Sequence, residues 1–200
     1  MARSATGGTD TGVSRIRPYA MLDIDDTTNV FMSRYRRWRA ERFADLADDE
    51  NIHDLLINRF IREADPSILV PTPGSRSALE AIARHVTPLA VSARDDDVYR
   101  HTYRLLEHHF PAVYDPAHVI LIGHHNGTPR ASKFETLEKR GITPVFIVED
   151  NYRTASEFAQ AGIVSFYIGA EGDRCPYLRR SDTYEDLWHE VRAFVESDYI

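Results

Sequence analysis

The stretch Tyr19-Ala20-Met21-Leu22-Asp23-Ile24-Asp25-Asp26-Thr27-Thr28 joins a short apolar run to a group of acidic residues. The apolar run predicts a buried strand, and alternation along it places Asp23 and Asp25 on the same side. In open α/β sheets, ligands bind outside the carboxyl ends of the strands, which is where this run stops. Two carboxylates that converge there are costly unless a cation neutralises them, and Mg²⁺ prefers oxygen ligands of this kind. The alternative is an acidic turn that caps the following helix, because Asp and Thr are common in turns and caps.

The rest of the chain alternates short apolar runs with segments of helical periodicity. Four further apolar runs predict strands at Pro88–Ser92, Val119–Ile122, Val145–Val148 and Ile163–Ile168. Helical spacing of apolar residues predicts helices at Ser75–His85, Asp95–Phe110, Thr154–Ala161 and Thr183–Glu196. This alternation predicts the α/β class, with a three-layer, Rossmann-like core in which helices cover both faces of a parallel sheet.

Residues 29–69 interrupt the alternation directly after the acidic stretch. They predict two helices, Val30–Leu46 and Ile52–Ala64, separated by the acidic Ala47–Asn51 segment and closed by Pro66. We therefore expect a flexible leader at 1–17, an α/β core at 18–28 and 70–200, and a small helical cap at 29–69. A cap inserted at this point is placed to cover the acidic stretch.

Length and composition bound the possible classes. Two hundred residues suffice for one well-buried domain with a modest insertion. The net charge of −7 argues against bulk attraction to nucleic acid, although a local basic patch could still bind it. A single cysteine, Cys175, excludes an internal disulfide framework and a multi-cysteine zinc site. No apolar run is long enough to span a bilayer or to form a signal peptide, so the expected location is cytoplasmic.

Four motifs occur in a fixed order along the chain. They are Asp23-Ile24-Asp25-Asp26-Thr27, Ser92 at the end of the second predicted strand, Lys133, and Glu149-Asp150 after Val145–Val148. In this order, from Tyr19 to about Ile168, they resemble the four motifs of the haloacid dehalogenase superfamily of phosphohydrolases. Ordered agreement of this kind is more specific than any single motif.

The resemblance implies a role for each motif. Asp23 would be the nucleophile that forms an aspartyl-phosphate, and Asp25 would protonate the leaving group and later deprotonate the attacking water. Asp23, the backbone carbonyl of Asp25, and Asp150 would hold Mg²⁺, with water and phosphate in the remaining positions. Ser92 and Lys133 would bind the phosphoryl group and offset its charge. Taken singly, Ser92 could instead cap a helix, and Lys133 could be a solvated helix residue.

Two positions are open to more than one interpretation. Glu149-Asp150 matches an adjacent acidic pair of the family, with Asp150 on the metal and Glu149 acting directly or through water. The other alignment uses a Gly-Asp form of the motif and requires Thr154 to replace a later acid. Arg94, two residues after Ser92, could reach a substrate anion or pair with Asp95–Asp97.

The predicted cap is basic and aromatic in an otherwise acidic protein. Its cations, Arg34, Arg36, Arg37 and Arg39, could grip a nucleotide or the end of a nucleic acid. The alternative is an amphipathic helix that buries Phe31, Tyr35 and Trp38 and leaves its arginines in solvent. The pairs His108-His109 and His124-His125 are weak zinc candidates, because neighbouring residues rarely point the same way. The loop His124–Arg130 follows a strand at the active edge and could line the site.

The motifs favour a Mg²⁺-dependent phosphohydrolase that cleaves a phosphate monoester of a small metabolite, a nucleotide or a nucleic-acid terminus. We expect the cap to choose the substrate. Asp25 argues against dehalogenation, because the superfamily's dehalogenases lack an acid there and a halide leaves without a proton.

Three other functions use similar residues. A phosphomutase or phosphotransferase would carry the same four motifs and pass the phosphoryl group to an alcohol. A receiver domain also combines acids, a hydroxyl group, a lysine and Mg²⁺, but its phosphoacceptor usually ends the third strand, where Val119–Ile122 leads into Gly123 and His124. A non-catalytic binding protein is disfavoured because Asp23 and Asp25 are both present.

Overall fold

The computed structural model describes residues 17–46, 50–123, 131–170, 172 and 175–199. Within this part of the chain, six parallel strands form one sheet in the order β3-β2-β1-β4-β5-β6. The strands are β1 (Tyr19–Leu22), β2 (Thr87–Ser92), β3 (Val119–Leu121), β4 (Phe146–Glu149), β5 (Val164–Ile168) and β6 (Leu178–Ser181). The predicted parallel sheet is confirmed.

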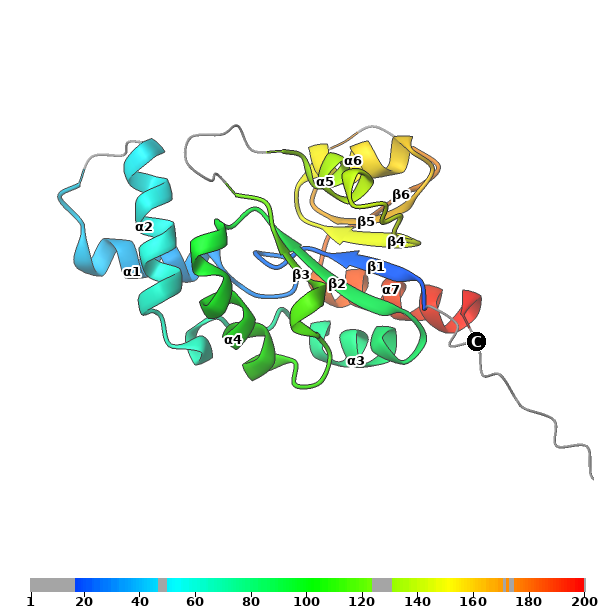
Figure 1. Ribbon diagram of the computed structural model, residues 1–200, viewed down its shortest axis with the longest axis horizontal. Coiled ribbons are helices and arrows are strands. Elements are labelled where there is room, and N and C mark those ends of the chain that lie inside the picture. Colours follow the sequence, from blue (N-terminus) through cyan, green and yellow to red (C-terminus); the bar gives the residue numbers. More distant parts are fainter. Residues whose placement is uncertain (1–16, 47–49, 124–130, 171, 173–174, 200) are drawn as a thin grey trace, which may run out of the picture.

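Helices cover both faces of this sheet (Figure 1). One face packs against α3 (Ser75–His85), α4 (Tyr99–His109) and α7 (Tyr184–Asp198), and the other against α5 (Lys133–Lys139) and α6 (Tyr152–Gln160). The helices α1 (Met32–Arg42) and α2 (Glu50–Glu63) lie together beyond one end of the sheet (Figure 1). The three-layer, Rossmann-like core is therefore confirmed.

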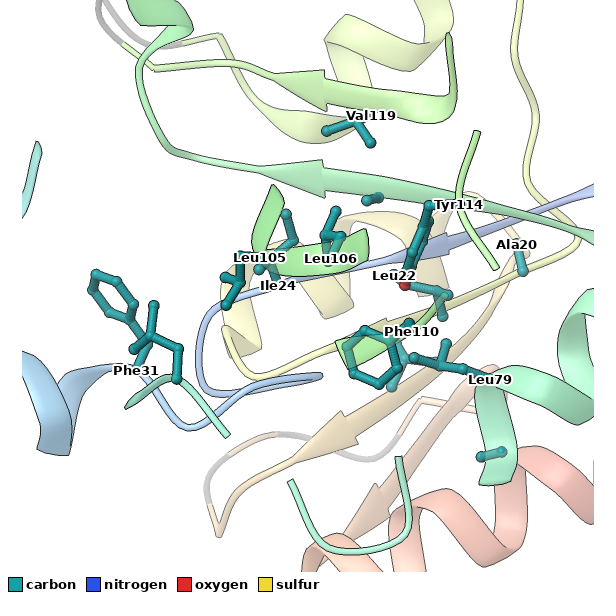
Figure 2. Close-up of a cluster of buried hydrophobic side chains, with 14 of the residues drawn as sticks. Ala20, Leu22, Ile24, Phe31, Leu79, Leu105, Leu106, Phe110, Tyr114 and Val119 are labelled. Atoms are coloured by element: carbon teal, nitrogen blue, oxygen red, sulfur yellow. The ribbon is translucent and has the colours of Figure 1, made fainter. Parts of the chain in front are cut away.

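Burial on both faces explains why the central strand β1 is continuously apolar. Ala20 and Leu22 of β1 belong to the core cluster beneath α3, α4 and α7, whereas Met21 between them belongs to the cluster beneath α5 and α6. All three side chains are fully buried. Figure 2 shows Ala20 and Leu22 on the same side of the sheet as Leu79 and Phe110. A strand with two buried faces needs apolar residues at every position, as β1 has.

The order of the strands places the acidic stretch at a ligand-binding position. From β1 the chain moves outward through β2 to β3, and then returns to β4 on the other side of β1. Parallel sheets bind ligands where the order of strands reverses in this way, at the carboxyl edge. Asp23 directly follows β1 at this point, and its backbone N–H donates to the Val148 carbonyl at 3.0 Å.

The chain leaves the core for α1 and returns from α2 through two neighbouring segments. The Val30 N–H donates to the Val70 carbonyl at 2.9 Å, and the Thr72 N–H donates to the Thr28 carbonyl at the same distance. Asp26 adopts a positive φ of 51°, and its carboxylate accepts from the N–H groups of Phe31 and Met32 at the start of α1. The acidic stretch thus caps the next helix, as one interpretation expected, but with Asp26, which leaves Asp23 and Asp25 for other partners.

The helices α1 and α2, predicted as a cap, are joined by an aromatic cluster. The Phe60 ring of α2 lies 5.5 Å from Phe31, 5.8 Å from Tyr35 and 5.3 Å from Trp38, measured between ring centroids. Phe31, Tyr35 and Trp38 are buried, as the amphipathic alternative required. The cluster is continuous with the core around Leu105 and Leu106 of α4. The cap helices therefore share one hydrophobic core with the rest of the protein.

Two polar contacts also tie α2 to the segment after β2. Asn58 donates to the Asp95 carboxylate, and Arg62 forms a salt bridge with Asp97. The predicted helix Asp95–Phe110 is in fact the 3₁₀ helix η2 (Asp96–Val98) followed by α4. Its three aspartates therefore do not begin one long helix, and two of them hold the cap helix α2.

The predicted helix boundaries need further correction. Helix α1 ends at Arg42, four residues before the predicted Leu46, and α6 begins at Tyr152 because the Asn151 side chain accepts from the Thr154 N–H. The strand β6 was not predicted, since Arg179 and Arg180 are exposed and interrupt any apolar run. Residues 1–16 of the predicted leader and 47–49 of the acidic segment lie outside the described residues. No helix of the described part is both long and apolar enough to cross a membrane.

The continuous core makes a prediction about stability. Replacing the fully buried Phe60 with Ala should lower the free energy of unfolding by about 3–5 kcal/mol, because a large ring is removed from a packed cluster. Urea unfolding followed by circular dichroism and tryptophan fluorescence measures this loss. Both signals should report one transition.

The matched control is Leu55→Ala on the same helix, where the side chain is 66% exposed. This change should alter the free energy of unfolding by less than about 0.5 kcal/mol. A loss below about 1 kcal/mol for Phe60→Ala, or a separate transition for the cap helices, would contradict the shared core.

Candidate active site

The motif residues meet around one cavity of about 610 Å³ at the carboxyl edge of the sheet. Asp23 and Asp25 follow β1, Ser92 ends β2, Lys133 begins α5, and Glu149-Asp150 end and follow β4. Residues far apart in sequence are brought together because parallel strands end at the same edge. The cavity is lined by Asp23, Asp25, Asp26, Met32, Ser92, Ala93, Ile122, Ala131, Ser132, Lys133, Glu135, Glu149, Asp150, Asn151, Arg153, Thr154 and Glu157.

Lys133 is the buried cation of the site. Its Nζ donates to Asp23 Oδ1, and to Glu149 Oε2 at 2.7 Å. Burial by itself lowers the pKa of an ammonium group, but the two carboxylates outweigh burial and raise the pKa of Lys133 above its ordinary value. Lys133 is only 7% exposed, so it is not the solvated helix residue of the alternative interpretation.

Asp23 sits in a buried and strongly negative environment. Its Oδ2 accepts from Thr27 Oγ1 at 3.1 Å, and its Oδ1 accepts from Lys133. Burial raises the pKa of Asp23 to about 7, and repulsion from Glu149 and Asp25 adds to this against the opposing effect of Lys133. Burial likewise raises the pKa of Asp150 to about 9, with repulsion from Asp23 and Glu149 as the next causes. When Asp23, Glu149 and Asp150 are all ionised, the site therefore carries more negative charge than Lys133 offsets.

The donor set fits a hard divalent cation. Asp23, Glu149 and Asp150 can each place a carboxylate oxygen within 4.8 Å of the others. Oxygen atoms are the ligands that Mg²⁺ prefers, and the unbalanced charge of these acids favours such an ion. Glu149 has other partners as well, since its Oε1 accepts from the Asn151 N–H at 3.1 Å and its Oε2 accepts from Lys133.

The structure places Arg94 on Asp25. Arg94 Nε donates to Asp25 Oδ2 at 2.9 Å, and its Nη2 donates to Asp25 Oδ1 at 2.5 Å. Neither a substrate-facing position nor pairing with Asp95–Asp97 describes this guanidinium, because it is buried and does not line the cavity. Ser92 is also buried, and its Oγ donates to Asp25 Oδ2 at 3.4 Å while it accepts from the Arg94 N–H at 3.3 Å.

The basic residues predicted to face the substrate from the cap do not line the cavity. Arg34, Arg36, Arg37 and Arg39 are on α1, but the residue of α1 that lines the cavity is Met32. Arg37 forms an exposed ion pair with Glu41 at 3.1 Å. Burial raises the pKa of Asp26, and attraction to Arg36 is the smallest of the effects that oppose this rise, after the hydrogen bonds from Phe31 and Met32.

The first histidine pair, His108-His109, does not line the described part of the cavity. His108 and His109 lie at the end of α4, where a ring nitrogen of His109 is 2.7 Å from the Pro66 carbonyl oxygen. His124, His125 and the rest of the loop to Arg130 lie outside the described residues. The zinc interpretation of the first pair is replaced by a contact between α4 and the 3₁₀ helix η1 (Pro66–Ile68).

Comparison with known proteins places this arrangement in a fold family. No protein-family model matches the chain, and no curated protein is similar enough in sequence to match. CbbY from Rhodobacter sphaeroides, solved with phosphate, matches with a TM-score of 0.55 and 14% identity over 86% of this chain and 96% of that one. A putative beta-phosphoglucomutase from Thermotoga maritima matches with a TM-score of 0.55 and 14% identity over 88% and 99%. A haloacid dehalogenase-like hydrolase from Streptococcus pneumoniae matches with a TM-score of 0.58 and 11% identity over 89% and 98%.

The chain has the haloacid dehalogenase fold. The resemblance carried by the four sequence motifs is therefore confirmed at the level of fold. In this haloacid dehalogenase fold, residues from each of the four motifs line one cavity, and their roles stay a prediction.

Sequence reasoning missed several residues of the site. Ser132 and Glu135 of the α5 region, and Arg153 and Glu157 of α6, form part of the cavity wall. Ser132 caps α5 by accepting from the Glu135 N–H at 3.0 Å, and its hydroxyl donates to Glu157 at 3.2 Å. A usable signal was present, because each of these residues lies within eight positions of Lys133 or of Glu149-Asp150.

The raised pKa values predict how the metal-free protein responds to pH. Asp23 and Asp150 have pKa values of about 7 and about 9 in the folded state, against 3.8 ordinarily, so the folded state binds more protons than the unfolded state across that window. In the presence of a metal chelator, the free energy of unfolding should therefore fall as the pH rises from about 5.5 to 8.5. Mg²⁺ should raise the melting temperature more at the higher pH, where the carboxylates are ionised. Differential scanning fluorimetry measures both effects.

Asp150→Asn is the control for this prediction. It keeps the size of the side chain and removes one ionisable group, so it should flatten the pH dependence and reduce the shift that Mg²⁺ produces. A melting temperature in chelator that stays constant or rises over this pH range in the natural protein would contradict the electrostatics of the site.

Proposed function

We propose that this haloacid dehalogenase-fold protein is a Mg²⁺-dependent phosphohydrolase that cleaves phosphate monoesters through a phosphorylated Asp23. The observation that carries the proposal is the buried Lys133, which bridges Asp23 and Glu149 beside a cavity that Asp25 also lines. A phosphate monoester is a dianion that repels nucleophiles, so its hydrolysis needs positive charge next to the attacking oxygen. The Lys133 ammonium supplies that charge where the Asp23 carboxylate lies.

The first step forms an aspartyl-phosphate. A carboxylate oxygen of Asp23 attacks phosphorus in line with the ester oxygen, so the bond from Asp23 to phosphorus forms as the ester bond breaks. Asp25 gives its proton to the departing alkoxide. Ser92, at the end of β2, lines the cavity and can donate to a phosphoryl oxygen.

The second step returns the enzyme to its starting state. Water attacks phosphorus of the aspartyl-phosphate, and Asp25 takes the proton of that water. The bond from Asp23 to phosphorus breaks, which regenerates the Asp23 carboxylate and releases inorganic phosphate. Asp23, Asp150 and the backbone carbonyl of Asp25 would hold Mg²⁺, which when bound would neutralise charge on the phosphoryl oxygens. Glu149 would hold Lys133 in place beside them.

The fold comparisons support a phosphorylated small molecule as substrate. CbbY of Rhodobacter sphaeroides has been solved with phosphate, and a variant of it with xylulose-1,5-bisphosphate. The cavity of about 610 Å³ is large enough for a ligand of metabolite size. Transfer to a second alcohol is the other candidate reaction, because two of the matching folds are putative beta-phosphoglucomutases. Product analysis with and without an acceptor alcohol separates hydrolysis from transfer.

A nucleic-acid terminal phosphate is a second substrate class. Arg36 is exposed on α1, and its charge is one of the smaller influences on the pKa of Asp26, which lines the cavity. A polynucleotide whose terminal phosphate enters the cavity could therefore extend over the basic face of α1.

Asp23→Asn tests the nucleophile. This change keeps the shape of the side chain and removes the attacking oxygen anion, so turnover of p-nitrophenyl phosphate should fall by about 10⁴-fold or more. Circular dichroism should show an unchanged fold. Asp182→Asn, at an exposed position, is the matched control and should keep full activity. Retention of most activity by Asp23→Asn, with contaminating phosphatase excluded, would remove Asp23 from this role.

Combined replacement of Arg36, Arg37 and Arg39 by Gln tests the second substrate class. Hydrolysis of p-nitrophenyl phosphate should stay within about twofold, because none of these residues lines the cavity. Hydrolysis of a phosphorylated oligonucleotide should fall by about tenfold or more, and its salt dependence should weaken. Equal effects on both substrates would return the arginines to the role of a solvated helix face.

A further inference from the structure

Arg94 is a buried cation whose guanidinium contacts an acid, a hydroxyl group and an aromatic ring. Its side chain is 2% exposed, and its two nitrogens Nε and Nη2 hold the two carboxylate oxygens of Asp25. The third nitrogen, Nη1, donates to Thr102 Oγ1 of α4 at 3.1 Å. The guanidinium carbon lies 5.1 Å from the centre of the Phe31 ring. Asp25, Thr102 and Phe31 therefore together fix the orientation of the planar guanidinium fork, that is, its Nε and Nη2 donors.

The backbone of Arg94 is held equally firmly. Its N–H donates to Ser92 Oγ, and its carbonyl accepts from the Gly123 N–H at 2.9 Å. A Cβ atom at Gly123 would lie 2.6 Å from the Arg94 carbonyl carbon and oxygen, so only glycine permits this approach. Arg94 therefore stands directly after β2, with its backbone joined both to the end of that strand and to the segment after β3.

In this position the guanidinium of Arg94 pairs with Asp25 and does not form part of the cavity wall. Arg94 does not line the cavity, whereas its partner Asp25 lines the cavity and is 25% exposed. Fork-to-carboxylate pairing fixes the plane of the carboxylate as well as its distance, which a lysine could not do. Within the part of the chain that the structure describes, the Ser92 hydroxyl also donates to the Asp25 carboxylate, at the longer distance of 3.4 Å.

We propose that Arg94 is a positioning residue for Asp25: its buried fork holds that carboxylate at the place where it exchanges a proton with the leaving oxygen. This inference rests on the proposed phosphohydrolase function. In the step concerned, the ester O–P bond breaks as the Asp23 O–P bond forms, and the Asp25 proton moves to the leaving oxygen to give a neutral alcohol. Arg94 itself touches neither the substrate nor the proton.

The proposal makes the effect of Arg94 depend on the leaving group. An alkoxide is a strong base and needs the proton of a correctly placed acid, whereas 2,4-dinitrophenolate is stable without one. Because kcat/KM covers only the steps up to release of the first product, it reports this proton transfer and excludes the later hydrolysis of the aspartyl-phosphate. The measurement is kcat/KM for a simple alkyl phosphate and for 2,4-dinitrophenyl phosphate in the same enzyme.

For Arg94→Gln, kcat/KM on the alkyl phosphate should fall by about 10²-fold or more, and on 2,4-dinitrophenyl phosphate by less than about fivefold. Inhibition by inorganic phosphate should change by less than about threefold, because the guanidinium does not bind the phosphoryl group. Arg94→Lys should resemble Arg94→Gln, since it restores the charge without the fork. In an Asp25→Asn background, Arg94→Gln should add no further loss on the alkyl ester.

Two further variants keep the test decisive should removal of the buried cation prevent folding. Thr102→Val removes only the hydroxyl that holds Nη1, and it should lower kcat/KM on the alkyl ester by about three- to tenfold while sparing the dinitrophenyl ester. Arg104→Gln, at an exposed position on the same helix, is the matched control and should change neither rate.

Equal losses on both esters, or a weakening of phosphate inhibition by about tenfold or more, would overturn the proposal in an active enzyme and assign Arg94 to the phosphoryl group or to general stability. Rescue of the alkyl ester by Arg94→Lys would also overturn it, because charge alone would then suffice. Absence of turnover by the natural protein on both esters would instead overturn the proposed function, and this inference with it.

Discussion

The contact of the buried Lys133 ammonium with Asp23 and Glu149 is the interaction on which the site depends. It joins residues 110 and 16 positions apart in sequence, and so fixes α5 against the carboxyl ends of β1 and β4. Without this cation, acids at the ends of two neighbouring strands would repel one another in a buried position. One cation does not balance Asp23, Glu149 and Asp150, which is why burial and mutual repulsion hold the pKa values of Asp23 and Asp150 high. The remaining imbalance suits a divalent ion and, next to it, a phosphoryl group.

Packing and polar contacts of the surrounding elements hold the helices and side chains next to this charge cluster in place. The cap helices share their aromatic cluster with α4, and two polar contacts hold α2 to the segment after β2. The same segment carries Arg94, which holds Asp25.

The wall of the cavity away from the motifs belongs largely to α5 and α6, with Met32 from α1. Residues of the core helices, such as Arg153 and Glu157, therefore compete with the cap as determinants of the substrate, and selection by the cap stays a prediction.

Much of this architecture could be predicted from the sequence, because two physical signals were strong. The continuous apolar runs of β1, β2 and β4 indicated strands buried on both faces, and acids and a serine at their ends indicated one shared edge. Weaker signals failed for identifiable reasons. The strand β6 carries exposed arginines, and the start of α6 depends on a hydrogen bond from Thr154 to the Asn151 side chain. The partner of Arg94 could not be deduced, since spacing alone left a substrate anion and Asp95–Asp97 as choices, and only tertiary packing turns the guanidinium toward Asp25.

A phosphoryl group carried covalently by Asp23 is the most direct consequence of this arrangement. Rapid acid quench of the protein during turnover of an aryl phosphate, followed by peptide mass spectrometry, detects such a group while the acyl phosphate is still stable. A single added phosphoryl group on the peptide that contains Asp23, lost when turnover is allowed to finish, is the predicted result. Steady hydrolysis with no phosphorylated peptide under conditions where transfer to the enzyme is faster than its hydrolysis, or a phosphoryl group on another residue, would contradict the central role of Asp23 and Lys133.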